Sequence, residues 1–385
     1  MANNNDKKVL NVPALRFPEF TEEWQGEQLH EIAELSKGIG ISKEQLSENG
    51  TPCILYGELY TKYKSEIISK IISKTDIEKS KLKHSKQNDV IIPCSGETAI
   101  DIAVARCVPF DNVLLGGDMN VIRLHKYDGA FMAYQLNGKR KTDIAKLAQG
   151  VSVVHLYGEN LKSIKTYNPS LQEQQKIVKL LSMLDERLEV QNKIIEDLKK
   201  LKSAITDLLF HSIADAHTIR LGEIAHITNG AGDVQDANTE HQEDWYPFFD
   251  RSEELKWFPT YSFDKEAVIY AGEGQSFYPR YYNGKFALHQ RCYAITDFAS
   301  CIIPKYCYHF MNTLNSYFVR NSVGSTVPSL RMDIFQKVEI RLPPIPKQQH
   351  ICKIIDAFYT KLEVEQRGIS ILQELKQFLL SQMFI

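Results

Sequence analysis

No long apolar run occurs among the 385 residues of this sequence. A transmembrane helix needs about 20 consecutive apolar residues, so no membrane span is predicted. The first eight residues are polar and lack the apolar core of a secretory signal. We therefore expect a cytoplasmic protein that does not associate with membranes.

Paired cysteines and nucleotide-binding glycine motifs are also missing. The cysteine count is seven, which is odd, and no CxxC pair occurs, so reduced thiols are expected and no zinc site is predicted. The sequence contains neither GxxxxGK[ST] nor HExxH, the patterns of a phosphate-binding loop and of a zinc protease. No metal or catalytic site is therefore predicted.

The sequence has no overall excess of basic charge, since 46 Lys and Arg face 48 Asp and Glu. The charges are nevertheless unevenly placed. Residues 62–86 hold eight lysines and three acids, residues 278–291 hold basic residues and no acid, and residues 233–244 hold five acids and no base. Patches of both signs are typical of a protein with a nucleic-acid face and separate protein-binding faces, although a mixed solvated surface explains any single patch equally well.

An internal repeat organises the chain. Residues 150–210 match residues 324–384 at a constant offset of 174 without a gap, and residues 29–40 match residues 221–232 at an offset of 192. The two offsets imply that the first copy carries about 18 extra residues between the matched ends. Between these ends the copies diverge, so the repeat predicts a variable domain and a helix, each occurring twice.

The matched C-terminal parts of the two copies predict long helices. Ser170 and Glu173 form a capping-box pattern, and Pro344 and Pro346 suit a helix start. Apolar residues then recur every three or four positions for about five heptads, as in a coiled coil, and polar residues interrupt both copies at equivalent places. The predicted helix seam consists of Ile177, Leu181, Leu184, Leu188, Ile195 and Leu198 in the first copy, and of Ile351, Ile355, Phe358, Leu362, Ile369 and Leu372 in the second.

Chain topology predicts the direction of the helix pair. The first helix ends where the second variable domain begins, and the second helix starts at the far edge of that domain. If the two seams pair, the helices are antiparallel and the domains lie at opposite ends with approximate two-fold symmetry. The predicted boundaries are 1–168 for the first domain, 169–214 for the first helix, 215–342 for the second domain and 343–385 for the second helix.

The variable domains are predicted to mix helices and strands, which makes the fold class α+β. Residues 90–92, 121–124, 268–270 and 338–340 are typical of strands. Residues 46–49 and 306–320 are predicted to be helical.

Two function classes other than DNA recognition remain as alternatives. A standalone DNA methyltransferase would place an Asn/Asp-Pro-Pro-aromatic loop against the target base, but Asn168-Pro169-Ser170-Leu171 lacks the aromatic residue, and its repeat counterpart at residues 342–345 lacks the amide. A coiled-coil adaptor without a nucleic-acid role is the other alternative. Neither the lone His155 nor the lone His289 has a catalytic partner in the sequence.

Candidate DNA-binding residues have charged, hydroxyl or aromatic side chains, or a position in predicted turns. Arg and Lys can bind guanine edges or phosphates, and polar side chains support both kinds of contact. The first-domain candidates are Lys37, Lys83, Lys86, Ser95, Lys139, Arg140 and Lys141. The second-domain candidates are Arg251, Arg280, Tyr281, Tyr282, Lys285, Arg291, Ser325, Thr326 and Arg331.

Two stretches resemble one protein family, the specificity subunits (HsdS) of type I restriction–modification systems. Residues 13–20 with Trp24 look like the family's N-terminal signature. Residues 324–330, followed by Ile340, Pro343-Pro344 and residues 348–351, look like its domain-closing motif. The first copy departs from that motif, because Val151 and Val154 stand where serine and proline are usual.

This resemblance implies a non-catalytic subunit with two target-recognition domains, each of which reads half of a bipartite site in double-stranded DNA. Two modification subunits would bring S-adenosylmethionine and methylate adenine, and restriction subunits would bring ATP and Mg²⁺ for translocation and cleavage. The helices would act as a ruler for the gap between the half-sites. No cofactor is expected on this chain itself.

Overall fold

The structure is a computed structural model that describes residues 10–385 except 79, 81, 212, 214 and 325. It contains two compact units. Unit 1 comprises Met1–Asn192 together with Arg367–Ile385, and unit 2 comprises Lys193–Gln366. The last turns of the chain therefore belong with its N-terminal part.

A four-stranded antiparallel sheet forms the centre of unit 1, with the strands in the order β2-β10-β6-β8. The strand β6 is buried along its whole length, as its apolar run predicts, and β10 contains the predicted strand 121–124. The helix α4 (Gly129–Asn137) packs against β6 and β8, and its first turn is capped by the side chain of Asp128. The strand bounds are Ala33–Lys37 for β2, Asp89–Pro93 for β6, Arg106–Val108 for β8 and Met119–Leu124 for β10.

A second sheet of unit 1 has the strand order β4-β3-β9-β5. Its strands are β3 (Leu46–Ile54), β4 (Ser73–Thr75), β5 (Lys83–His84) and β9 (Leu114–Leu115). The helix predicted at residues 46–49 is wrong, because these residues begin β3. Leu46 pairs with Thr75 before a bulge interrupts the ladder, so pairing with a distant strand overrides the local helical pattern.

The central sheet of unit 2 has six strands in the order β14-β19-β17-β18-β15-β16. The predicted strand 268–270 lies in β17, whereas the predicted helix 306–320 is broken into α9 and α10. The strand bounds are His226–Asn229 (β14), Tyr246–Phe249 (β15), Lys256–Phe258 (β16), Phe263–Ala271 (β17), Arg280–Leu288 (β18) and Cys292–Thr296 (β19). The helix bounds are Pro304–Met311 (α9), Asn315–Asn321 (α10) and Met332–Gln336 (α11).

The two units share one scaffold. The order β2-β10-β6-β8 in unit 1 corresponds to β14-β19-β17-β18 in unit 2. In each unit the first strand of the domain pairs antiparallel with the strand that precedes the long helix: β1 pairs with β12, and β13 pairs with β20. A short helix directly follows β1 and β13. Their bounds are Gln25–Gln28 (β1), Leu29–Ile32 (α1), Lys165–Asn168 (β12), His217–Arg220 (β13), Leu221–Ile224 (α8) and Glu339–Leu342 (β20).

The length difference between the copies falls in one segment of the scaffold. In unit 1 the segment 38–88 separates the end of β2 at Lys37 from the start of β6 at Asp89. In unit 2 the shorter segment 230–262 separates the end of β14 at Asn229 from the start of β17 at Phe263. The excess in unit 1 equals the difference between the two repeat offsets, 192 minus 174, so the predicted insertion lies within the segment 38–88.

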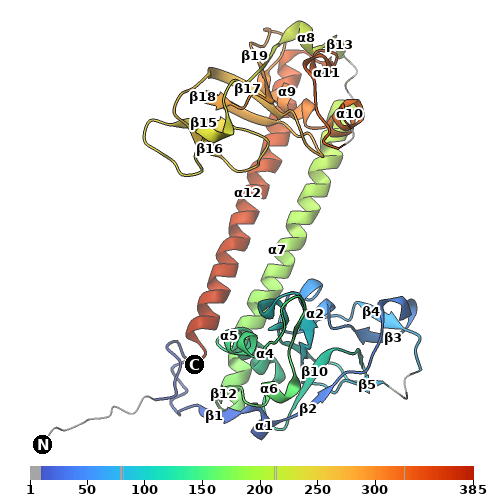
Figure 1. The fold of residues 1–385 in the computed structure, drawn as a ribbon, viewed down its shortest axis with the longest axis vertical. Coiled ribbons are helices and arrows are strands. Elements are labelled where there is room, and N and C mark those ends of the chain that lie inside the picture. Colours follow the sequence, from blue (N-terminus) through green and yellow to red (C-terminus); the bar gives the residue numbers. More distant parts are fainter. Residues whose placement is uncertain (1–9, 79, 81, 212, 214, 325) are drawn as a thin grey trace, which may run out of the picture. The chain divides into compact units, whose positions relative to one another are not determined.

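Two long helices follow the domains, α7 (Leu171–His211, green in Figure 1) and α12 (Ile345–Gln382, red). Within unit 1, the start of α7 shares an apolar cluster with the end of α12, in which Ile177 and Leu181 lie with Leu379 and Leu380. Asp185, further along α7, contacts Lys376, which lies earlier on α12. The contacted positions on α12 decrease as those on α7 increase, so the helices are antiparallel in this unit.

Unit 2 shows the same antiparallel arrangement. The ammonium group of Lys202 lies 4.1 Å from the ring centre of Tyr359, and further along α7 Phe210 joins the cluster that contains Ile351 and Ile355. All twelve residues of the predicted helix seam are buried or half-buried. Two polar residues within this stripe are buried as well, Gln191 and Lys376.

The duplicated glutamines explain why the repeat is strongest at the helix starts. The Gln174 side chain accepts a hydrogen bond from the backbone N–H of Asp128 at 2.9 Å and donates to the Pro169 carbonyl at 2.8 Å. Gln348 does the same with Ile303 at 2.9 Å and Pro343 at 2.8 Å. Each glutamine thus ties the first turn of a long helix to the start of α4 or α9, where buried backbone groups need partners.

The predicted capping box at α7 forms only in part. The Ser170 hydroxyl accepts a hydrogen bond from the backbone N–H of Glu173 at 3.4 Å. The Glu173 carboxylate turns instead to Arg16, which donates two hydrogen bonds of 2.7 and 2.8 Å, and to the indole N–H of Trp24. An ion pair from the N-terminal segment therefore replaces the reciprocal cap.

Candidate nucleic-acid interface

The candidate residues from the sequence fall into three groups according to their contacts in the structure. The first group directs its polar atoms into the protein. Ser95 is buried, and its hydroxyl lies 3.4 Å from Asp118. Arg280 donates two hydrogen bonds of 2.6 Å to the backbone carbonyls of Asp250 and Ser252, so its guanidinium group holds a loop in place.

Arg140 and Tyr281 belong to the same group, whereas Tyr282 is held by ring contacts alone. Arg140 donates a hydrogen bond to a terminal oxygen of Ile385 and lies over the Tyr167 ring, so it helps to fix the C-terminus. The Tyr281 hydroxyl donates to Glu266, and Tyr282 packs on Phe249 and Phe286. The polar atoms of Ser95, Arg140, Arg280 and Tyr281 would have to leave these partners to contact DNA.

The second group lies at the surface but already has a partner. Arg291 forms an ion pair of 2.6 Å with Glu273, and the Lys285 ammonium group lies 4.7 Å from the ring centre of Tyr261. The basic run 278–291 contains no acid, but the fold supplies one from a neighbouring segment. A sequence window cannot show this neutralisation, because Glu273 lies outside it.

The third group keeps its side chains available to solvent. Exposed members are Lys37, Lys86, Lys139, Arg251, Thr326 and Arg331, and half-buried members are Lys83 on β5 and Lys141 at the start of α5 (Lys141–Lys146). Ser325 lies outside the described residues. These side chains do not belong to a single domain, since they are divided between the two units.

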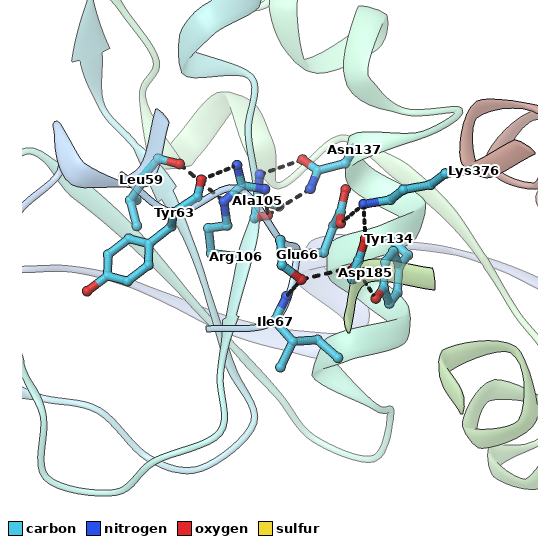
Figure 2. A network of polar contacts seen from close by, with 11 residues as sticks. Leu59, Tyr63, Glu66, Ile67, Ala105, Arg106, Tyr134, Asn137, Asp185 and Lys376 are labelled. Carbon is cyan, nitrogen blue, oxygen red and sulfur yellow. Dashed lines mark hydrogen bonds and ion pairs between the residues drawn. The ribbon is translucent and has the colours of Figure 1, made fainter. Parts of the chain in front are cut away.

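A buried polar network in unit 1 was missed by sequence reasoning (Figure 2). The Lys376 ammonium group lies between the carboxylates of Glu66 and Asp185, 2.6 Å from the latter. Tyr134 and Ser65 donate hydrogen bonds of 2.7 and 3.0 Å to the same Asp185 oxygen. The only signal in the sequence was a lysine within an apolar helix stripe.

Arg106 extends this network to the segment that is longer in unit 1. Its guanidinium group is buried and donates to the backbone carbonyls of Leu59 at 3.1 Å and Tyr63 at 2.9 Å, at the helix α2 (Glu58–Thr61). Glu66 and Ser65 lie in the same segment. The network therefore fixes the inserted segment to both long helices.

Unit 2 has a different polar group between the corresponding helices. His309 on α9 is buried, and its Nε2 lies 3.0 Å from Asp356 on α12, which also pairs with Lys305 at 2.8 Å. Burial lowers the pKa of His309, and the Asp356 carboxylate partly opposes this shift. His309 is therefore neutral at neutral pH.

We expect unit 2 to lose stability as the pH falls below about 6.5, the ordinary pKa of histidine. The unfolded chain binds a proton on His309 near that pH, whereas the folded unit resists protonation until a lower pH, since its pKa is lowered. Lys305 and Lys202 further disfavour a positive charge there. Urea unfolding of the full chain at pH 7.5 and 5.5, with pulsed hydrogen exchange in unit 2 as readout, measures this effect. The His309→Gln variant should show a smaller difference between the two pH values; an undiminished difference would contradict the assignment.

Among the described residues, no group of three or more His, Cys, Asp or Glu side chains is placed to hold a metal ion. The Asn168 amide points inward and donates to Glu27 and Thr166, both at 3.1 Å. Within the part of the chain that the structure describes, no helix is both long and apolar enough to cross a membrane.

The chain contains two copies of one scaffold of helices and strands, and each copy continues into a long helix of an antiparallel pair. This arrangement defines a class of duplicated proteins that present two different surfaces on a repeated frame. The sequence profile of the type I restriction modification DNA specificity domain matches twice, over residues 21–200 and 214–377. The chain therefore belongs to this family.

Individual relatives agree with this assignment. The chain is 31% identical over 165 residues to the EcoDI specificity subunit of Escherichia coli, a match that covers 43% of this chain and 36% of that protein. It is 24% identical over 198 residues to the MjaVIII specificity subunit of Methanocaldococcus jannaschii, which covers 50% and 46%. The matches thus span less than half of each relative.

Two solved structures share the fold. One is a type I restriction–modification S subunit from M. genitalium, with a TM-score of 0.67 at 18% identity, covering 97% of this chain and 99% of that one. The other is a chain from a study of complex assembly and conformational transition in a type I system, with a TM-score of 0.59 at 16% identity and coverages of 95% and 98%. At these identities the likeness shows the fold alone.

Proposed function

We propose that this chain selects the DNA sequence for a type I restriction–modification complex, and that each domain reads one half of a bipartite site in double-stranded DNA. The proposal rests on the fact that some parts of the repeat are shared by the two units and others differ. Scaffold and helices recur in both units, whereas the segments 38–88 and 230–262 differ in length and fold. Two readers of unlike half-sites on one frame need this combination.

The helix pair supports a role as a ruler between the two readers. Antiparallel contacts occur in both units, and the seam is continued by polar contacts at Lys376 and Lys202. A fixed helix length would set the number of unread base pairs between the half-sites. The predicted boundaries 1–168, 169–214, 215–342 and 343–385 remain part of this proposal.

The proposal assigns methylation and cleavage to partner subunits. Exposed apolar residues recur at equivalent positions of the two helices, Val190 with Val364 and Leu201 with Leu375, each at least 41% exposed. Apolar side chains left exposed in the same pattern twice are suited to bind two copies of one protein. Two modification subunits with S-adenosylmethionine, and restriction subunits with ATP and Mg²⁺, would supply the chemistry.

Exchanging one domain tests the function directly. We expect a chain whose residues 215–342 come from another specificity subunit to change one half-site and keep the other, because the scaffold of unit 1 and the helices are untouched. Sequencing of methylated adenines in cells that carry the chain with its partner subunits measures the site. A change in both halves would contradict separate reading, and the unmodified chain run in parallel is the control.

DNA binding by the isolated chain provides a second test. The net charge of -2 offers little general attraction to phosphates, so we expect weak binding by the chain alone. The complex should bind tightly, with an affinity that falls steeply as salt is raised. Methyl transfer from labelled S-adenosylmethionine by the pure chain would instead favour a standalone methyltransferase, and equal affinity of the complex for all sequences would favour an adaptor.

A further inference from the structure

One exposed site is built by the same backbone in both units but carries different side chains. It begins at the last residue of the second scaffold strand, Lys37 of β2 in unit 1 and Asn229 of β14 in unit 2. Lys37 pairs across the sheet with Asn120, and Asn229 pairs with Tyr293. Both Lys37 and Asn229 are exposed.

The strand partners connect these positions to a second matched segment. The Asn120 amide donates a hydrogen bond of 3.0 Å to the Leu156 carbonyl, and the Tyr293 hydroxyl donates one of 3.0 Å to the Leu330 carbonyl. Leu156 and Leu330 are buried repeat counterparts. Tyr157 follows Leu156 and Arg331 follows Leu330, so each comes directly after a leucine whose carbonyl is bound by the partner of the strand-end residue.

The backbone around this point is the same in both units. Gln149 and His155 exchange two backbone hydrogen bonds of 2.9 and 2.7 Å, and Val323 and Ser329 exchange two of 2.8 Å. Gly150 and Gly324 follow the first residue of each bonded pair and have φ angles of 124° and 108°. Residues other than glycine rarely adopt such angles. The repeat thus conserves the support and leaves the presented side chains free to differ.

The presented side chains have the chemistry of base recognition. In unit 1 the Lys37 ammonium group lies 6.0 Å from the ring centre of Tyr157, and the His155 ring stacks on the same tyrosine with the ring centres 6.2 Å apart. In unit 2 the corresponding positions hold Asn229 and Arg331. Lysine and arginine donate to guanine edges, and asparagine pairs with adenine edges.

Neither cation at this site, Lys37 or Arg331, forms an ion pair within the described ranges. Asp333, two residues after Arg331, forms its ion pair with Lys337 at 2.7 Å and interacts with Arg331 only through longer-range electrostatics. This distinguishes them from Arg280 and Arg291, whose donors already bind the protein. Asn229 keeps one weak contact, a hydrogen bond of 3.3 Å to the Gln290 carbonyl.

We propose that these equivalent positions, Lys37 with Tyr157 in unit 1 and Asn229 with Arg331 in unit 2, read base edges in the two halves of the DNA site. The inference rests on the proposed function, because it assigns residues to the reading of half-sites. A protein partner present in two copies would meet the same side chains on both units. The presented side chains differ here while the backbone that carries them is shared, and this favours two unlike DNA half-sites.

The test exchanges the side-chain pairs within the full chain, assembled with its modification subunits. The double variant K37N/Y157R gives unit 1 the pair of unit 2, and N229K/R331Y does the reverse. Methylation of a DNA library with both half-sites randomised is the readout. Each double variant should change base preference roughly 5- to 100-fold at one or two positions of its own half-site, and leave the other half-site as in the unmodified complex.

Single truncations and a matched lysine keep the outcome decisive. K37A and R331A remove exposed side chains without new contacts, and each should relax preference in one half-site. Lys165 is also exposed in unit 1 but lies on β12, outside the segment 38–88, so K165A should leave both half-sites unchanged. Unaltered half-sites in all exchange and truncation variants would overturn the proposal, as would loss of modification-subunit binding with unchanged base preference. An unmodified complex that methylates no bipartite sequence would instead refute the proposed function.

Discussion

Replacing Phe384 by alanine is expected to lower the free energy of unfolding of unit 1 by about 3–5 kcal/mol. Phe384 is next to last in the chain and 2% exposed. Its ring centre lies 5.3 Å from that of Phe131 and 6.4 Å from that of Trp24, in the cluster where the two long helices meet the N-terminal segment. Removing the ring leaves a cavity among side chains that other parts of the backbone hold in place.

Urea unfolding followed by Trp24 fluorescence measures this loss of stability, in a chain whose Trp245 and Trp257 are replaced by phenylalanine. Both of those tryptophans lie in unit 2, so the remaining signal reports on unit 1. Phe378 lies on the same helix but is 54% exposed, and F378A should change stability by no more than about 0.5 kcal/mol. Equal effects of F384A and F378A would show that the end of α12 is not part of the unit 1 core.

Replacing Lys376 by methionine is expected to destabilise unit 1 by about 3–5 kcal/mol, because it removes the cation that contacts two buried carboxylates directly. The side chains of Lys376, Glu66 and Asp185 are 11%, 8% and 8% exposed. Methionine is close to lysine in length, so packing of the aliphatic stem is largely kept and the loss reports on charge. The same Trp24 fluorescence assay measures the change.

Lys202 is the matched control, because it is the repeat counterpart of Lys376 on the other long helix. It meets the Tyr359 ring where Lys376 meets Asp185, so K202M should cost only about 0.5–1 kcal/mol in unit 2. The triple variant E66Q/D185N/K376M removes all three charges and should recover part of the stability lost in K376M. If K376M is as mild as K202M, the carboxylates are not buried as the structure indicates.

The contrast between Lys376 and Lys202 shows how a repeated frame carries two different domains. The two long helices carry a lysine at equivalent positions. Lys376 faces Glu66, Asp185 and Tyr134 in unit 1, whereas Lys202 faces Tyr359 in unit 2. Glu66 comes from the segment that is longer in unit 1. A transplanted first domain that lacked this carboxylate would therefore lose one of the two anions that face Lys376.

The amino-acid sequence by itself determined the repeat, the two long helices and the position of their seam. These features follow from local periodicity and from self-similarity, which need no knowledge of distant contacts. The two offsets also determined the length difference between the copies, and the structure shows that it lies between β2 and β6. The family resemblance rested on motifs at the domain ends, where Gln174 and Gln348 make the same contacts in both copies.

Only the tertiary structure decided which polar side chains remain available for a ligand. Arg280 and Arg140 are basic residues in promising segments, but their donors bind backbone oxygens that the chain brings from elsewhere. Residues 46–49 similarly form a strand because Thr75 lies beside them. Hydrogen bonds and ion pairs between distant segments leave no periodic pattern in the sequence. The sequence therefore revealed the repeated frame, but it did not reveal which candidate side chains are bound within the protein. It also did not reveal that Lys37 and Arg331 remain exposed.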